Sequence, residues 1–219
     1  MYLVVKRAEI EKNMVRQIKS FFEMPKSERT ALGLAIEIAI SRMEILMNAT
    51  SEDLKYSHIN GIPAFNSLNT DQYAMFLYIV SNTCYKNFEE ANLASKVYYL
   101  NKIMHGIDVY YEVMLPEIFK FGHCVGTVLG RAKYGNYFGV MHNCTVGNNL
   151  GKYPTFEDRV GMLVGSKVLG DSYIGRNTII SANTTIIDEN IPENSIVFGS
   201  SPNLVIKSNN ITMYREKFK

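Results

Sequence analysis

Residues 156–191 read FEDRVG, MLVGSK, VLGDSY, IGRNTI, ISANTT and IIDENI when they are written six at a time. Residues 134–151 have the same period, as YGNYFG, VMHNCT and VGNNLG, and the insertion KYPT (152–155) separates the two blocks. The first position of every hexad is apolar: Tyr134, Val140, Val146, Phe156, Met162, Val168, Ile174, Ile180 and Ile186. A sustained short period of this kind is typical of a solenoid of stacked strands. We therefore expect a parallel β-helix.

The period of six has a physical explanation. Three short strands joined by tight turns bring the chain back above its start, so each leading residue stacks on its counterpart one coil later inside a triangular prism. Small residues occupy the fifth position, where the walls converge: Cys144, Ser166, Ser172, Thr178 and Thr184. Residues that tolerate positive φ fall at the expected turns: Asn136, Asn148, Asp171, Asn177 and Asn183. This pattern predicts three stacked walls.

The first half of the chain has a helical pattern instead. Apolar residues recur at intervals of three and four between Leu32 and Met47, the spacing of an amphipathic helix. We expect a second helix over 71–81 with Thr70 as its N-cap, and a third over 89–105 that ends at Gly106. The sequence thus predicts an α+β protein, with a helical domain over 1–105, a β-helix over 106–207 and a C-terminal tail over 208–219.

Composition narrows the functional classes. The 219 residues include 23 basic and 21 acidic residues with no basic cluster, which argues against nucleic acid or anionic lipid as a partner and favours a small molecule. Three cysteines without a CxxC pair indicate neither a disulfide framework nor a zinc site. The most apolar run, 32–40, contains Glu37 and is too short to span a bilayer, and the N-terminus lacks a signal-peptide core. We expect a cytoplasmic protein.

Several stretches of the second half resemble a known family. They are GIDVYYEV (106–113), GHCVGTVLG (122–130), HNCTVG (142–147), GSKVLGDSYIG (165–175) and IPENSIVFGSSPNLVIK (191–207). These segments resemble the left-handed parallel β-helix of the hexapeptide-repeat acyltransferases, and most of all the serine acetyltransferase branch, in which a helical region also precedes the coils. The resemblance implies an acetyl-CoA-dependent acetyltransferase, with left-handed coils that the spacing alone does not establish.

The resemblance also implies a catalytic pair. The family uses a histidine to deprotonate the acceptor hydroxyl, with an aspartate fifteen residues earlier as its partner; here His123 and Asp108 stand fifteen residues apart. A carboxylate that fixes one imidazole nitrogen orients the other and stabilises the imidazolium that forms. The alternative is that His123 is a structural or surface histidine.

Other histidines offer weaker candidates. His142 lies 19 residues after His123, about one coil later, so it is a candidate for an accessory role in orienting the acceptor. β-Helical proteins related to carbonic anhydrase hold zinc with three histidines, but only two occur in these coils, while His58 and His105 belong to the helical half. We expect no metal.

Two departures from the serine-specific pattern concern the acceptor. Gly122 stands where the family has an aspartate beside its base, and Lys152, Tyr153 and Pro154 replace an Arg-His-Pro segment. A charged amino acid would lack partners in such a site. We expect Tyr153 and Lys152 to bind the acceptor, and the favoured acceptor is a sugar hydroxyl in surface-polysaccharide biosynthesis. Serine is the alternative.

The family's use of coenzyme A implies further positions. The residues that match its CoA-binding positions are Gly147, Ser166, Lys167, Ala182 and Lys207, the last as a phosphate contact. Because the family binds this cosubstrate between adjacent prisms, the resemblance implies a trimer or a dimer of trimers. Two other classes stay open: an N-acetyltransferase of an amino sugar, and a non-catalytic scaffold or metalloenzyme.

Overall fold

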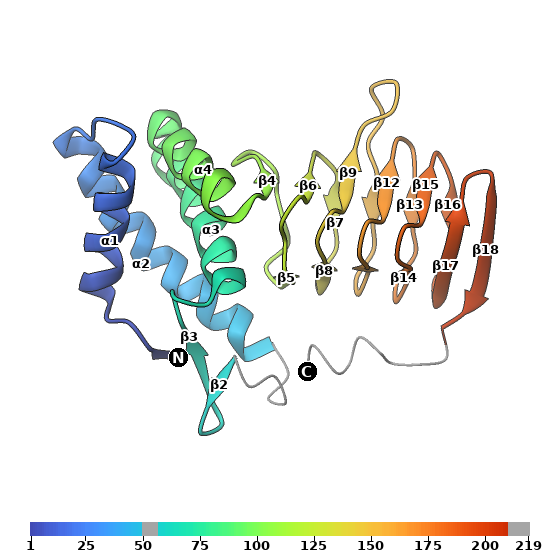
Figure 1. The fold of residues 1–219 in the computed structure, drawn as a ribbon, viewed down its shortest axis with the longest axis horizontal. Coiled ribbons are helices and arrows are strands. Elements are labelled where there is room, and N and C mark those ends of the chain that lie inside the picture. The colour runs from blue at the N-terminus through green and yellow to red at the C-terminus, as the bar shows by residue number, and fades with distance from the viewer. Residues whose placement is uncertain (50–56, 210–219) are drawn as a thin grey trace. The chain divides into compact units, whose positions relative to one another are not determined.

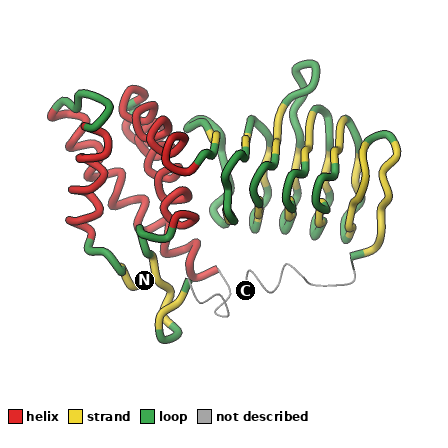
Figure 2. Tube along the Cα trace, viewed as in Figure 1, coloured by secondary structure: helices red, strands yellow, loops and turns green. Residues whose placement is uncertain are grey.

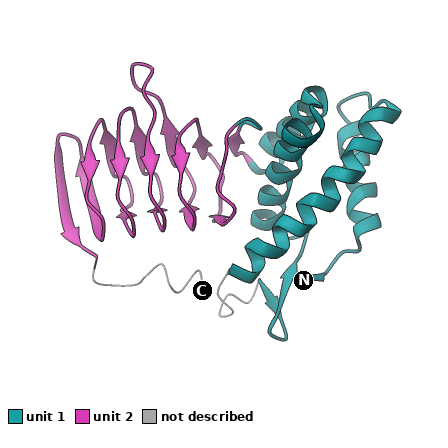
Figure 3. Cartoon of the chain, turned by 180° about the vertical axis from the view of Figure 1, so that it is seen from behind, with its two compact units in different colours: residues 1–105, 110–112 teal, residues 106–109, 113–219 magenta. Residues whose placement is uncertain are grey.

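The computed structural model of the protein describes residues 1–49 and 57–209. It divides into two compact units, shown in Figure 3: unit 1 comprises residues 1–105 and 110–112, and unit 2 comprises residues 106–109 and 113–219. Most of the C-terminal tail expected from the sequence, residues 210–219, lies outside the described residues.

Unit 1 is helical, as the sequence predicts (Figure 2). Its helices are α1 (Arg7–Lys19), α2 (Lys26–Ala49), α3 (Thr70–Phe88) and α4 (Ala91–His105), and strands β1 (Tyr2–Leu3), β2 (His58–Ile59) and β3 (Ile62–Phe65) form a small sheet. Helix α3 packs against α2 and α4, and it is buried on all sides over residues 72–84. None of the helices in the described ranges is long and apolar enough to cross a membrane.

The start of α3 differs from the prediction by one residue. Asn69 is the N-cap, because its side chain accepts a hydrogen bond from the Gln72 backbone nitrogen at 3.1 Å, and Thr70 is already helical. Asparagine and threonine are both effective N-caps, so residue type alone does not show which of these two neighbours caps the helix. The helix also continues past residue 81 to Phe88 and ends at Glu89, whose φ is 55°.

Unit 2 is a parallel β-solenoid whose coils follow one another in Figure 1. The first wall contains β5 (Phe119–Phe121), β8 (Phe138–Val140), β11 (Gly161–Met162) and β14 (Ile179–Ile180). The second wall contains β4 (Asp108–Val109), β6 (Val128–Leu129), β9 (Thr145–Gly147), β12 (Lys167–Leu169) and β15 (Thr185–Ile187). The third wall contains β7 (Lys133–Tyr134), β10 (Thr155–Phe156), β13 (Tyr173–Ile174) and β16 (Asn190–Ile191). A final hairpin of β17 (Ser195–Ser200) and β18 (Asn203–Ser208) closes the solenoid.

The stacking expected from the hexads is confirmed. Val140 pairs with Met162 and Met162 with Ile180, so counterparts are 22 residues apart across the insertion and 18 apart after it. The leading residues are buried apart from Tyr134, which is partly buried, and they form the core of the prism. Asn177 and Asn183 have positive φ, as expected at turns. Asn136, Asn148 and Asp171 do not. The residues with positive φ at those turns are Tyr137, then Leu150 and Gly151, and then Gly170.

A glycine substitution can test how tightly the coils are stacked. A Cβ atom at Gly175 would overlap the backbone nitrogen of Glu193 and lie 2.7 Å from the carbonyl carbon of Pro192. We expect Gly175→Ala to lower the free energy of unfolding by about 1–3 kcal/mol, because backbone in the next coil cannot move aside. Gly147→Ala is the control, since its Cβ would only touch the flexible Leu169 side chain at 3.4 Å. Equal urea denaturation midpoints for the two variants would contradict this packing.

Candidate active site

His123 lies in a bulge at the corner between the first and second walls. Phe121 and Leu129 are eight residues apart, whereas the residues paired with them, Val140 and Val146, are six apart, so the first coil carries two extra residues here. The bulge gives His123 a φ of 50°, and its carbonyl oxygen accepts a 2.7 Å hydrogen bond from the Val125 nitrogen. Cys124 turns inward and is buried, while His123 stays exposed.

Asp108 lies at the same corner on the preceding coil. The Gly126 nitrogen donates a hydrogen bond to the Gly106 carbonyl at 2.9 Å, so Gly106 and Gly126 lie side by side at this corner. Asp108 follows this corner directly, opposite Val128 in the pairing of β4 with β6, and its side chain is on the outer, partly exposed face. The structure thus brings together the two residues of the expected catalytic pair at one corner of adjacent coils.

Gly122, beside His123, is covered by the next coil. A Cβ atom at this position would lie 2.8 Å from the Met141 sulfur. An aspartate in place of Gly122 would therefore require the Met141 side chain to move. At this departure from the serine-specific pattern, a thioether rather than a carboxylate therefore lies near His123.

His142 occupies the same corner one coil later. The Asn143 nitrogen donates to Val125 and the Gly165 nitrogen donates to His142, so His142 stacks above Val125. Its side chain is partly buried, and its Nδ1 atom is buried without a hydrogen-bond partner among the described residues. His142 and His123 therefore face the same corner, as its expected accessory role requires.

The two expected acceptor residues, Lys152 and Tyr153, lie elsewhere on the prism. They belong to the loop over residues 148–154, which leaves β9 and enters β10, between the second and third walls. Strands of a parallel wall run in one direction, so residues before β6 and residues after β9 lie at opposite edges of the second wall. Within one chain, the His123 corner and this loop therefore lie at opposite edges of the second wall.

Lys152 already has an anionic partner. Its Nζ atom lies 2.7 Å from an Asp171 carboxylate oxygen, and this contact raises the pKa of the Lys152 ammonium. Tyr153 is exposed beside it.

The five positions expected to bind coenzyme A are spread over the solenoid. Gly147 and Lys167 lie on the second wall, and Lys167 stands in the same outward column as Asp108, three strand spacings or about 14 Å away. Ala182 is exposed, on the fourth coil, near the corner that holds His142. Ser166 is buried with its hydroxyl 3.6 Å from the Cys144 sulfur, so only its backbone can face a ligand. Lys207 is on β18, over the Phe198 ring.

Within residues 1–49 and 57–209, no group of three or more His, Cys, Asp or Glu side chains is arranged to hold a metal ion.

Comparisons with known proteins bear on these features. No family model matches the chain. The serine acetyltransferase of Bacillus licheniformis is 26% identical over 157 residues, which cover 69% of this chain and 70% of that protein. The enzyme of Mycobacterium tuberculosis is 30% identical over 103 residues, 45% of this chain and 44% of the relative.

Solved structures show the same fold. The serine acetyltransferase of Neisseria gonorrhoeae superposes with a TM-score of 0.70 at 18% identity, over 90% of this chain and 78% of that one. The chain thus has the helical region and parallel β-solenoid of these serine acetyltransferases, and it is similar to them in sequence. The fold class expected from the sequence is therefore confirmed. The relatives are acetyltransferases, which is the class of enzyme that the sequence predicts. Similar structures include a serine acetyltransferase in complex with CoA and the gonococcal enzyme in complex with serine.

Three features of this chain have no counterpart in the sequence predictions. They are the two-residue bulge at His123, the Met141 sulfur over Gly122, and a polar network that ties the 148–154 loop to Asp171 and Asp188. The bulge precedes the first hexad at residue 134, and the network joins residues up to 39 positions apart. No local pattern marks either one.

Proposed function

We propose that this chain is an acetyl-CoA-dependent O-acetyltransferase and that its acceptor is serine. The observation that carries the proposal is the placement of Asp108 and His123 at one corner of adjacent coils, in a chain whose relatives are serine acetyltransferases. The serine-bound and CoA-bound structures of relatives support this choice of acceptor and acetyl donor.

In this proposal His123 accepts the proton of the acceptor hydroxyl. The hydroxyl oxygen attacks the thioester carbonyl, a C–O bond forms, the C–S bond breaks, and the proton on His123 passes to the departing CoA thiolate. Asp108 holds the imidazole in place and stabilises its cationic form during the transfer. The outer face of the second wall, with Lys167 and Gly147, would hold the pantetheine arm, and Lys207 would contact a phosphate.

The separation of the His123 corner from the Lys152–Tyr153 loop supports a homo-oligomer. If prisms pack side by side, one protomer's loop can approach another protomer's His123 corner, so an acceptor site would be shared between copies. A trimer, single or doubled, satisfies this requirement. The molar mass in solution, measured by light scattering, tests it.

A second candidate acceptor is the hydroxyl of a sugar. It is favoured by Gly122, which provides no carboxylate for an amino group, and by Lys152, whose charge is balanced by Asp171. A neutral ring next to Tyr153 would need neither partner. The relatives, however, favour serine over a role in polysaccharide synthesis.

An acceptor panel tests the choice. CoA thiol release from acetyl-CoA would be followed with L-serine, a neutral hexose and an amino sugar, with acceptor-free enzyme as the blank. We expect kcat/KM for serine to exceed that for the hexose by at least about tenfold, which corresponds to about 1.4 kcal/mol. A hexose that reacts faster than serine would replace the first candidate with the second, and a preference for the amino sugar would indicate N-acetylation.

A further inference from the structure

The loop over residues 148–154 has a defined conformation. It connects β9 to β10 in the chain, and it is the loop that projects from the solenoid beyond β9 in Figure 1. Asn149 and Lys152 exchange backbone hydrogen bonds of 3.1 and 3.0 Å, and the two residues between them, Leu150 and Gly151, have φ values of 50° and 80°. Two positive φ angles in a two-residue connection are typical of a type I′ hairpin. The loop is therefore a small hairpin.

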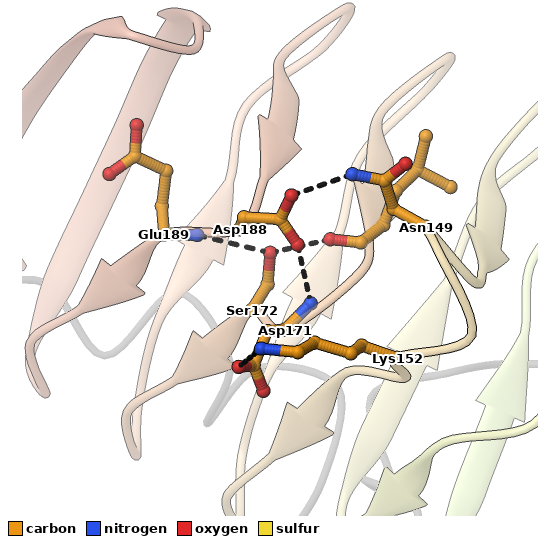
Figure 4. A network of polar contacts seen from close by, with 7 residues as sticks. Asn149, Lys152, Asp171, Ser172, Asp188 and Glu189 are labelled. Carbon is orange, nitrogen blue, oxygen red and sulfur yellow. Dashed lines mark hydrogen bonds and ion pairs between the residues drawn. The ribbon is translucent and has the colours of Figure 1, made fainter.

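Asp188 anchors the first arm of this hairpin. One carboxylate oxygen accepts a 2.6 Å hydrogen bond from the Asn149 side-chain amide, and the other accepts a 2.7 Å bond from the Asp171 backbone nitrogen (Figure 4). A Cβ atom at Gly170 would overlap this carboxylate, so the glycine leaves the space that Asp188 fills. The hairpin is thus attached to a coil 39 residues further along the chain.

Lys152 anchors the second arm through its 2.7 Å contact with Asp171. Both side chains are more than 60% exposed, so this ion pair alone contributes little stability. Asp188 and Asp171 are linked, however, by the bond to the Asp171 nitrogen. We call these four residues, Asn149, Lys152, Asp171 and Asp188, the loop brace.

The loop brace fixes the backbone of Tyr153, two residues before strand β10 of the third wall begins. Tyr153 directly follows the anchored Lys152, and Pro154, which comes next, is buried and restricts the backbone of the residue before it. The backbone of Tyr153 is therefore constrained on both sides, while its side chain remains exposed. A side chain carried on a backbone held in this way can meet a substrate with little further loss of backbone freedom.

We propose that Asp188 is a positioning residue for the acceptor, because it holds the 148–154 hairpin in the orientation that presents Tyr153. This inference rests on the proposed function, with its acceptor site shared between copies, and on the contact between Tyr153 and the acceptor that the sequence predicts. Asp188 itself contacts no reacting atom, and it acts only through the hairpin.

The variant Asp188→Asn tests this inference with little change in shape. The carboxylate accepts two hydrogen bonds on two oxygens, whereas an amide offers one oxygen and places an NH2 group against a second donor. We expect the acceptor KM to rise by roughly tenfold, with kcat and the Kd of acetyl-CoA little changed. In a Tyr153→Ala background the same substitution should change KM by less than about twofold, because the residue that it positions is gone.

Asp158→Asn is the matched control. The Asp158 carboxylate also accepts a hydrogen bond from a backbone nitrogen, that of Asn136 at 2.8 Å, but at a different turn of the solenoid. We expect this variant to leave the acceptor KM within about twofold of wild type. Hydrogen exchange of the 148–154 peptide gives a readout that is independent of activity, and it should be faster in Asp188→Asn only.

The outcomes separate the two proposals. Unchanged hydrogen exchange in Asp188→Asn would overturn the brace, whatever the activity. Faster exchange with an unchanged KM, or an equal rise in KM in the Tyr153→Ala background, would overturn the positioning role while leaving the proposed function intact. A wild-type enzyme that acetylates no acceptor would overturn the proposed function and, with it, this inference.

Discussion

Replacing His123 with asparagine lowers kcat for acetyl transfer by at least about 100-fold, because general-base assistance contributes roughly 10²–10⁴. Asparagine is the appropriate replacement since His123 has a φ of 50°, a conformation that asparagine tolerates better than alanine does. The Kd of acetyl-CoA should change little, because the imidazole acts on the acceptor hydroxyl. Steady-state kinetics and calorimetry on the same preparation measure both quantities.

His142→Asn is the control for this prediction. It removes the second imidazole at the same corner, where the Nδ1 atom of His142 is buried. We expect it to lower kcat by less than about tenfold, since an accessory residue that orients the acceptor contributes less than the base. Equal losses in the two variants, or a near-normal kcat in His123→Asn, would remove His123 from its proposed role.

Replacing Lys96 with methionine lowers the free energy of unfolding of unit 1 by about 3 kcal/mol, the scale for removing one partner of a buried ion pair. The Lys96 ammonium lies 2.7 Å from both carboxylate oxygens of Glu28 and 2.8 Å from the Glu23 carbonyl oxygen. The side chains of Glu28 and Lys96 are only 7% and 19% exposed. Without Lys96, the Glu28 carboxylate stays buried with no cation beside it.

An exposed ion pair in the same unit provides the comparison. Arg7 and Glu37 are 3.3 Å apart, with side chains 47% and 61% exposed, so Glu37→Gln should cost less than about 1 kcal/mol. In the double variant Glu28→Gln/Lys96→Met we expect a loss smaller than the sum of the two single losses, because neither charge is left alone. Chemical denaturation curves of Lys96→Met, Glu28→Gln, the double variant and Glu37→Gln give the comparison. Similar losses for Lys96→Met and Glu37→Gln would contradict the account of the buried pair.

The sequence predicts the walls of the solenoid because their cause is periodic. An apolar residue at every sixth position specifies which side chains stack, and the four-residue insertion at 152–155 alters the spacing without altering the pairing of Val140 with Met162. The helices of unit 1 also follow from their pattern. The N-cap at Asn69 is missed by one residue, because two adjacent residues can both cap a helix.

The site could be predicted only in part, because its geometry depends on non-periodic features. His123 protrudes through a bulge that precedes the first hexad, and Gly122 is covered by Met141 of the next coil. The contact between Asn149 and Asp188 spans 39 residues and has no signature in either segment. The family resemblance predicts His123 and Asp108 as base and partner from their spacing, but the surroundings of the proposed acceptor site depend on these long-range contacts.

The chemical nature of the product tests the central claim most directly. Acetyl-CoA and L-serine would be incubated with the enzyme, quenched in acid after short times so that the amine cannot capture the ester, and examined by NMR. The account predicts an O-acetyl ester that accumulates in step with free CoA and is lost in His123→Asn. An N-acetyl amide at the earliest time, or bound CoA without any acetylated product, would contradict it.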